Sequence, residues 1–135
     1  MIAKLFLGLQ VILFIPYGLL CLVSPESLAD GAGVVATGIT GTIELQTMYG
    51  GLQVAVGVLC LVGLIRERFE PVALHALLFI FAGLAVVRVS LALMHGDFSG
   101  YTTFAMAYET FCLLFLTWFL LIRNGSPVPE RISVR

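Results

Sequence analysis

Apolar residues dominate four long stretches of the chain, and short polar segments separate them. Each stretch has roughly 19 to 23 residues, which is long enough as a helix to cross a hydrocarbon core about 30 Å thick. So short a chain could not enclose four such helices in a soluble core. The pattern predicts an all-α, four-helix transmembrane bundle of up-down-up-down topology, forming one domain over residues 1–135. The expected spans are residues 5–23, 44–65, 72–94 and 104–122, followed by a flexible tail over residues 124–135.

The segment between spans one and two carries the signature of a short helix. Ser24 is followed by Pro25 and by Glu26 in the expected first turn, and Gly31 is a natural stop. These residues predict one or two helical turns beginning at Pro25 and lying on the outer membrane surface. Residues 32–42, rich in Gly, Thr and Val, indicate an ordered loop or a short hairpin.

Basic residues flank the predicted spans on one side only. The two segments expected on the other side, residues 24–43 and 95–103, contain no Lys or Arg. Positive charge in short loops marks the cytoplasmic side of a membrane protein. We therefore expect a multi-pass protein of the bacterial inner membrane with both termini in the cytoplasm. The basic residues that support this orientation are Lys4, Arg66, Arg68, Arg123, Arg131 and Arg135.

The composition excludes several classes of function. The net charge is −1 and no basic patch is present, so nucleic acid is not an expected partner. Cys21, Cys60 and Cys112 lie in different spans without a Cys-x-x-Cys pair, which disfavours a thiol–disulfide catalyst and favours buried small apolar side chains. His75 and His95 fall near opposite membrane faces, and neither has a cluster of ligands beside it. No metal or cofactor is expected.

Arg88 is the most informative residue because it interrupts the apolar run of span three. A guanidinium at membrane depth costs several kcal/mol unless it faces protein or water and finds a partner. With a helical rise of about 1.5 Å per residue, Arg88, Glu109 and Tyr49 all lie roughly 6 to 8 Å outward of the bilayer centre. Gln53 lies near the centre, and Glu44 lies near the outer interface.

This common depth predicts a fork-shaped bond between Arg88 and Glu109, with Tyr49 or Gln53 taking up the remaining donors. With Glu44, these residues form the candidate ligand site or buried polar network. The pair could equally fix the register of the helices or line a functional site. For Glu44 the alternative is a first-turn carboxylate that the helix dipole favours. No residue is assigned a catalytic role.

Span two has one face of small and polar residues. Small residues let helices approach closely, and polar side chains bond across such contacts. At about 100° per residue, this face contains Gln46, Tyr49, Gly50, Gln53, Gly57 and Cys60.

Several short motifs in the chain resemble those of one family. They are Glu44-Leu45-Gln46 with Tyr49-Gly50-Gly51, then Arg88-Val89-Ser90 with a following Gly96-Asp97, and Glu109 in the last span. The set is similar to a bacterial family of four-span membrane proteins, a domain of unknown function of the DUF4345 type that is DoxX-like in plan. The resemblance runs from span one to span four, and it implies a compact four-helix fold with no established activity. The chain departs from it at Gln46, where the resemblance implies Arg, and at His95 before Gly96.

Three classes of function are open. The leading expectation is a non-enzymatic accessory or scaffold subunit of a larger membrane complex or homo-oligomer, which the small-residue face of span two favours. The first alternative is a protein or enzyme that binds a lipid or quinone in a polar pocket of the outer leaflet. The second is a proton-coupled small-molecule exporter, although span one has no acid. Membrane lipids are expected partners in every case.

Overall fold

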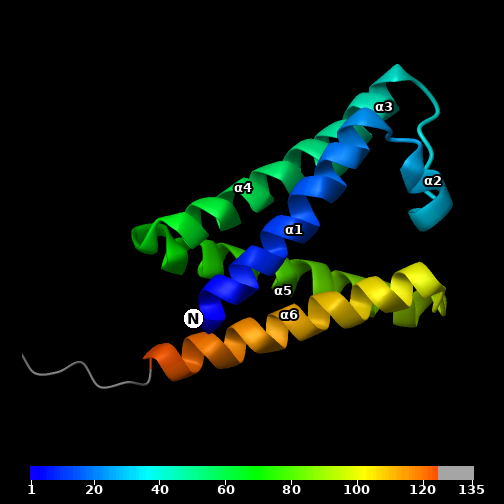
Figure 1. Ribbon diagram of the computed structural model, residues 1–135. Helices are drawn as coiled ribbons and strands as arrows, with labels where there is room; N and C mark the ends of the chain where they lie inside the picture. Colours follow the sequence, from blue (N-terminus) through cyan, green and yellow to red (C-terminus); the bar gives the residue numbers. More distant parts are fainter. Residues whose placement is uncertain (125–135) are drawn as a thin grey trace, which may run out of the picture.

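The computed structural model describes residues 1–124, and its elements are all helical (Figure 1). They are α1 (Ile2–Val23), α2 (Ser27–Ala32), α3 (Ile39–Leu45), the π-helix η1 (Gln46–Gly51), α4 (Leu52–Ile65), the 3-10 helix η2 (Glu67–Phe69), α5 (Glu70–His95) and α6 (Gly100–Asn124). Because α3, η1 and α4 run on from one another, four helices are long and apolar enough to cross a membrane, at Ile2–Val23, Ile39–Ile65, Glu67–His95 and Gly100–Arg123. The predicted all-α four-helix bundle is confirmed. The expected flexible tail lies outside the described residues, apart from Asn124 in α6.

The short helix between the first two spans is present, but it is shifted along the chain. It begins at Ser27, whose hydroxyl donates to the Ser24 carbonyl over 2.7 Å, and Pro25 lies in the preceding turn. It ends after Ala32 because Gly33, with φ 68°, adopts the left-handed conformation that closes a helix. The predicted stop at Gly31 was therefore wrong, because the later glycine makes the turn.

The expected loop or hairpin over residues 32–42 is shorter than predicted. Helix α3 already begins at Ile39, so span two starts before Glu44. No strand occurs within residues 1–124. The polar and small residues of this segment show no helical period, so a loop was expected. In the structure, α3 is continuous with the apolar helix that follows it.

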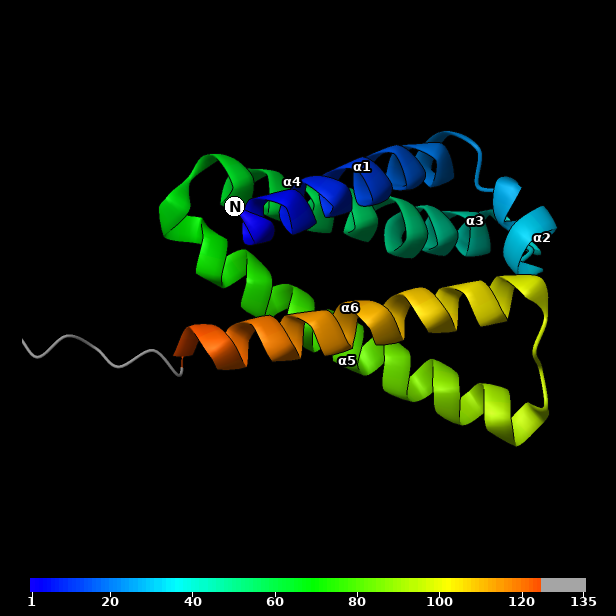
Figure 2. The same cartoon turned by 60° about the horizontal axis from the view of Figure 1, so that its bottom comes forward.

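The long helices form two pairs. Helix α1 packs on α4 and η1, and α5 packs on α6 (Figure 1). The pairs meet where residue 1, η2 and the end of α6 lie, which we call the terminal end. They separate toward α2 and the turn between α5 and α6, which we call the α2 end (Figures 1 and 2). Helix α2 contacts both α1 and α6, so it bridges the two pairs.

The apolar core lies toward the terminal end. Its fully buried members come from all four spans and include Leu7, Cys60, Leu74, Leu77 and Leu116. Stacked rings continue this packing to α6, where Phe6 and Phe115 have centroids 4.7 Å apart. Dispersion contacts of this kind hold helices together in lipid, where burial of apolar surface gives little driving force.

Glycines bring α1 and the span-two helices into close contact. A Cβ on Gly18 would lie 2.8 Å from both the Gly50 carbonyl oxygen and the Val54 amide nitrogen. A Cβ on Gly57 would lie 2.5 Å from Cγ1 of Ile15. The small residues of span two are therefore used inside the chain, against α1.

Candidate functional site

Arg88 and Glu109 form a two-point ion pair between α5 and α6. Nε of Arg88 donates to Oε2 of Glu109, and Nη2 donates to Oε1, each over 2.8 Å. A fork of this kind is stronger than a single hydrogen bond and fixes the orientation of both groups. The direct contact that their common depth predicts is present.

Two small residues lie near Arg88 on α5, the helix that packs on α6. Ala85 and Ala92 stand one helical turn to either side of Arg88, and both are buried. Helix α5 ends at His95, where Gly96 takes up a φ of 66° that glycine tolerates without strain. The chain then turns back, so α5 and α6 become antiparallel neighbours with Glu109 opposite Arg88.

The two partners differ in their exposure. The side chain of Glu109 is 7% exposed, whereas that of Arg88 is 29% exposed. Arg88 is open on one side because it lines a pocket of about 540 Å³. The lining residues are Gly83, Leu84, Val87, Arg88, Leu91, Ala92, His95, Asp97 and Thr102. The walls along α5 are thus mainly apolar, and polar groups stand at Arg88 and at the α2 end.

Asp97 organises the polar end of this pocket. The hydroxyl of Thr102 donates to Oδ2 of Asp97 over 2.8 Å, and the amide of Ser99 donates to Oδ1 over 3.0 Å. These hydrogen bonds, that of Thr102 above all, hold the pKa of Asp97 below its ordinary value. The carboxylate is therefore charged at neutral pH, and it fixes the start of α6.

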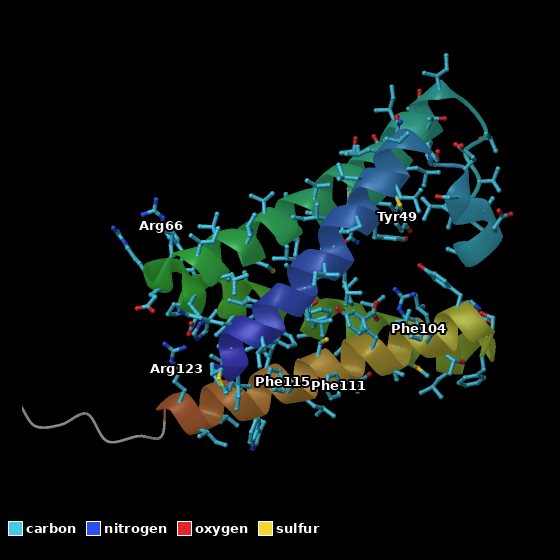
Figure 3. The ribbon with its side chains drawn as sticks, viewed as in Figure 1. Tyr49, Arg66, Phe104, Phe111, Phe115 and Arg123 are labelled. Atoms are coloured by element: carbon cyan, nitrogen blue, oxygen red, sulfur yellow. The ribbon has the colours of Figure 1, made fainter. Side chains whose placement is uncertain are left out.

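The other predicted site residues lie on the α1–α4 side of the molecule. Tyr49 and Gln53 are half-buried, and Glu44 is exposed. Tyr49 belongs to η1, and Figure 3 shows it apart from Phe104 and Phe111 of α6. Within residues 1–124, no side-chain hydrogen bond joins any of these three residues to Arg88 or Glu109. Their part in a ligand site stays a prediction.

The π turn explains why the predicted face of span two is only approximate. Leu52 donates its amide to the carbonyl of Thr47, five residues back, which is the hydrogen bond of a π-helix. At the start of η1, the side-chain amide of Gln46 donates to the Leu22 carbonyl of α1 over 2.7 Å. A regular step of about 100° per residue assumes an unbroken α-helix. The periodicity of the residues does not predict this interruption.

A buried polar cluster between α1 and α6 was not predicted from the sequence. Gln10 is fully buried; the Tyr108 hydroxyl donates to its Oε1 over 2.5 Å, and its amide lies 3.9 Å from the sulfur of Cys112. A signal was present, because Gln10 is a lone amide in an apolar run and Tyr108 precedes Glu109. The depth comparison that paired Arg88 with Glu109 does not find this cluster, because it places Gln10 roughly 6 Å inward and Tyr108 roughly 7 to 8 Å outward of the bilayer centre.

The described residues offer no obvious metal centre. No group of three or more His, Cys, Asp or Glu side chains that could hold an ion occurs within residues 1–124. The cysteines Cys21, Cys60 and Cys112 are free and buried, as expected for small apolar side chains.

Comparison with known proteins gives one match. Residues 2–120 match the family model described as "Domain of unknown function (DUF4345)". No curated protein and no solved structure matches the chain. Since the match covers nearly all of the described helices, this chain belongs to the DUF4345 family of unknown function.

Proposed function

We propose that this membrane protein binds an amphipathic, lipid-like molecule in the pocket beside Arg88 and does not itself catalyse a reaction. The observation that carries the proposal is the uneven exposure of the ion pair. If the pair only fixed the register of the helices, we would expect both side chains to be buried. The guanidinium of Arg88 instead faces a pocket of about 540 Å³. Ligand pockets typically have volumes of about 300–1,000 Å³ and combine apolar walls with a few polar groups.

The polar and apolar groups of the pocket are distributed as such a ligand would require. Leu84, Val87 and Leu91 offer an apolar surface along α5, and Arg88 offers hydrogen-bond donors within it. Asp97 and Thr102 mark its polar end. A molecule with an apolar body and a small polar group would match this distribution.

The other two classes of function receive less support. The scaffold role rested on the small-residue face of span two, yet Gly50 and Gly57 are in contact with α1 within the chain. A proton-coupled exporter needs a carboxylate that is free to carry a proton, yet both oxygens of Glu109 accept bonds from Arg88. No structural observation favours either of them over a binding site.

We also infer that both termini face the cytoplasm of a bacterial cell, so that the pocket opens toward the outer leaflet. The distribution of basic residues supports this orientation. In intact cells, Thr37→Cys should react with an impermeant maleimide and Glu67→Cys should not. The wild-type chain is the control, since Cys21, Cys60 and Cys112 are buried. The reverse labelling would overturn the orientation.

Native mass spectrometry of the gently solubilised protein tests the binding proposal. We expect a co-purifying lipid-like adduct that is lost when Leu91→Trp fills the pocket. Leu93→Trp is the matched control, because Leu93 lies on the same helix, does not line the pocket and is also exposed. An adduct that survives Leu91→Trp as well as Leu93→Trp, or its absence from the wild-type protein, would contradict the proposal. A protein partner in its place would support the scaffold role.

A further inference from the structure

We infer that the polar group recognised beside Arg88 is a neutral hydrogen-bond acceptor, such as a ketone, ester or quinone carbonyl, and not a phosphate. This inference rests on the proposed function, because it concerns the ligand of the same pocket. It is carried by two features of the site, the unused donors of Arg88 and the balance of charge around them.

The first feature is the number of donors that Arg88 keeps free. A guanidinium carries five N–H groups in a fixed plane. Glu109 accepts one from Nε and one from Nη2, which leaves the two on Nη1 and the second on Nη2. No other acceptor within residues 1–124 is hydrogen-bonded to Arg88, and the side chain is partly exposed in the pocket. A carbonyl oxygen, with two lone pairs, is a suitable partner for these donors.

The second feature is the charge that an incoming group would meet. The positive charge of Arg88 is already matched by Glu109, and Asp97 adds a further carboxylate at the polar end of the same pocket. A phosphate beside Arg88 would therefore meet a guanidinium whose charge Glu109 already balances, and the nearly buried carboxylate of Glu109 would repel it at close range. A neutral acceptor gains the hydrogen bonds without this repulsion.

Matched probes can separate these two kinds of polar group. We suggest 2-tetradecanone, dodecyl phosphate and tetradecane, which share a long alkyl chain and differ in the polar group. They compete in equal amounts for the wild-type protein in detergent, and native mass spectrometry counts the adducts. We expect the ketone to be bound at least tenfold more than the phosphate, and the alkane to be bound weakly. If no probe binds, the proposed function fails; if the phosphate is preferred, only the present inference fails.

Two conservative substitutions sharpen the test. Glu109→Gln removes the balancing charge but keeps an acceptor for Arg88, so the preference should shift at least tenfold toward dodecyl phosphate. Arg88→Lys keeps the charge but loses the planar fork, and ketone binding should fall about tenfold, the loss of one hydrogen bond. Arg123→Lys is the control, because it makes the same change in an ion pair at the terminal end and should alter nothing.

The pattern of results decides the inference. An unchanged preference in Glu109→Gln, with helical content and monodispersity equal to wild type, would overturn it. If that variant does not fold, the ratio of ketone to phosphate on the wild-type protein still decides the matter.

Discussion

The terminal end and the α2 end of this bundle differ in composition and in packing, because the halves of the spans nearer α2 carry most of the polar residues, Glu44, Arg88 and Glu109 among them. At the terminal end, side chains from all four spans meet, and Leu7, Leu74 and Leu116 are fully buried. At the α2 end the two helix pairs separate, and α2 bridges them (Figures 1 and 2). Each pair is then held separately, α1 to α4 by glycine contacts and α5 to α6 by the Arg88–Glu109 fork.

This difference follows from how helices associate in a membrane. In lipid, apolar side chains gain little by leaving their surroundings, so helices associate where shapes fit or polar groups bond. The pairs pack closely at the terminal end, where the rings of Phe6 and Phe115 stack, and the Gln10–Tyr108 hydrogen bond joins α1 to α6 near the level of the ion pair. The pairs separate toward α2, and the pocket beside Arg88 is lined by residues of α5, α6 and the turn between them. The following predictions test this contrast.

The largest effect is expected from breaking the ion pair. Arg88→Ala leaves the nearly buried carboxylate of Glu109 without a partner, and the loss of stability should be about 3–5 kcal/mol. Glu109→Ala should cost less, because Arg88 is more exposed and can reach polar surroundings. The melting temperature in detergent measures both. The double variant with Leu at both positions should recover much of the loss, and failure to do so would show that the pair is coupled to further groups.

Close packing of α1 on the span-two helices is tested by Gly18→Ala. Its Cβ would press on the Gly50 carbonyl and the Val54 amide, which are backbone atoms and cannot turn aside, so we expect a loss of about 1–3 kcal/mol. Gly83→Ala is the matched control. Its Cβ meets nothing within 4 Å, and replacing a mid-helix glycine should stabilise the protein by about 0.5–1 kcal/mol. Equal melting temperatures for the two variants would contradict this account of the α1–α4 contact.

The buried polar cluster should contribute a smaller amount. Tyr108→Phe leaves Oε1 of Gln10 without its donor, and the expected loss is about 1–2 kcal/mol. Adding Gln10→Leu removes the orphaned group, so the double variant should be more stable than Tyr108→Phe alone. A thermodynamic cycle of the single and double variants measures this coupling. Additive losses would mean that the hydrogen bond is not the source of the effect.

The smallest effects are expected from the ion pairs at the terminal end. Lys4 lies 3.0 Å from Glu67, and Arg123 lies 2.7 Å from Glu70. Both cations are well exposed, so Lys4→Ala and Arg123→Ala should each cost no more than about 1 kcal/mol. The losses should shrink further as salt is raised, because exposed charges are screened. A loss of stability as large as that of Arg88→Ala would contradict the expectation that exposed ion pairs contribute less than the nearly buried pair.

The features that could be predicted from the sequence, the four spans and the Arg88–Glu109 contact, follow from the composition and depth of individual helices. Four apolar runs of membrane length leave no other fold, and a lone Arg88 at the depth of a lone Glu109 requires a partner. Features that depend on the packing of one helix against another could not be predicted. The separation of the pairs, the π turn and the cluster at Gln10 arise from contacts between spans. The choice of Gly33 over Gly31 as the helix stop is similar, since Leu28 is buried and Gly31 lies against the Tyr101 ring.

The π turn of η1 absorbs one residue of span two without interrupting the helix. A π turn takes in one residue more than an α-helical turn while the helix continues. Deleting a single residue within Gln46–Gly51 would therefore restore a regular α-helical turn and leave α3 and α4 close to their present directions. The same deletion within α4 would rotate the two parts of the helix by about 100° relative to each other and shorten the helix by about 1.5 Å. Changes of length in span two should therefore be tolerated better at the π turn than within α4.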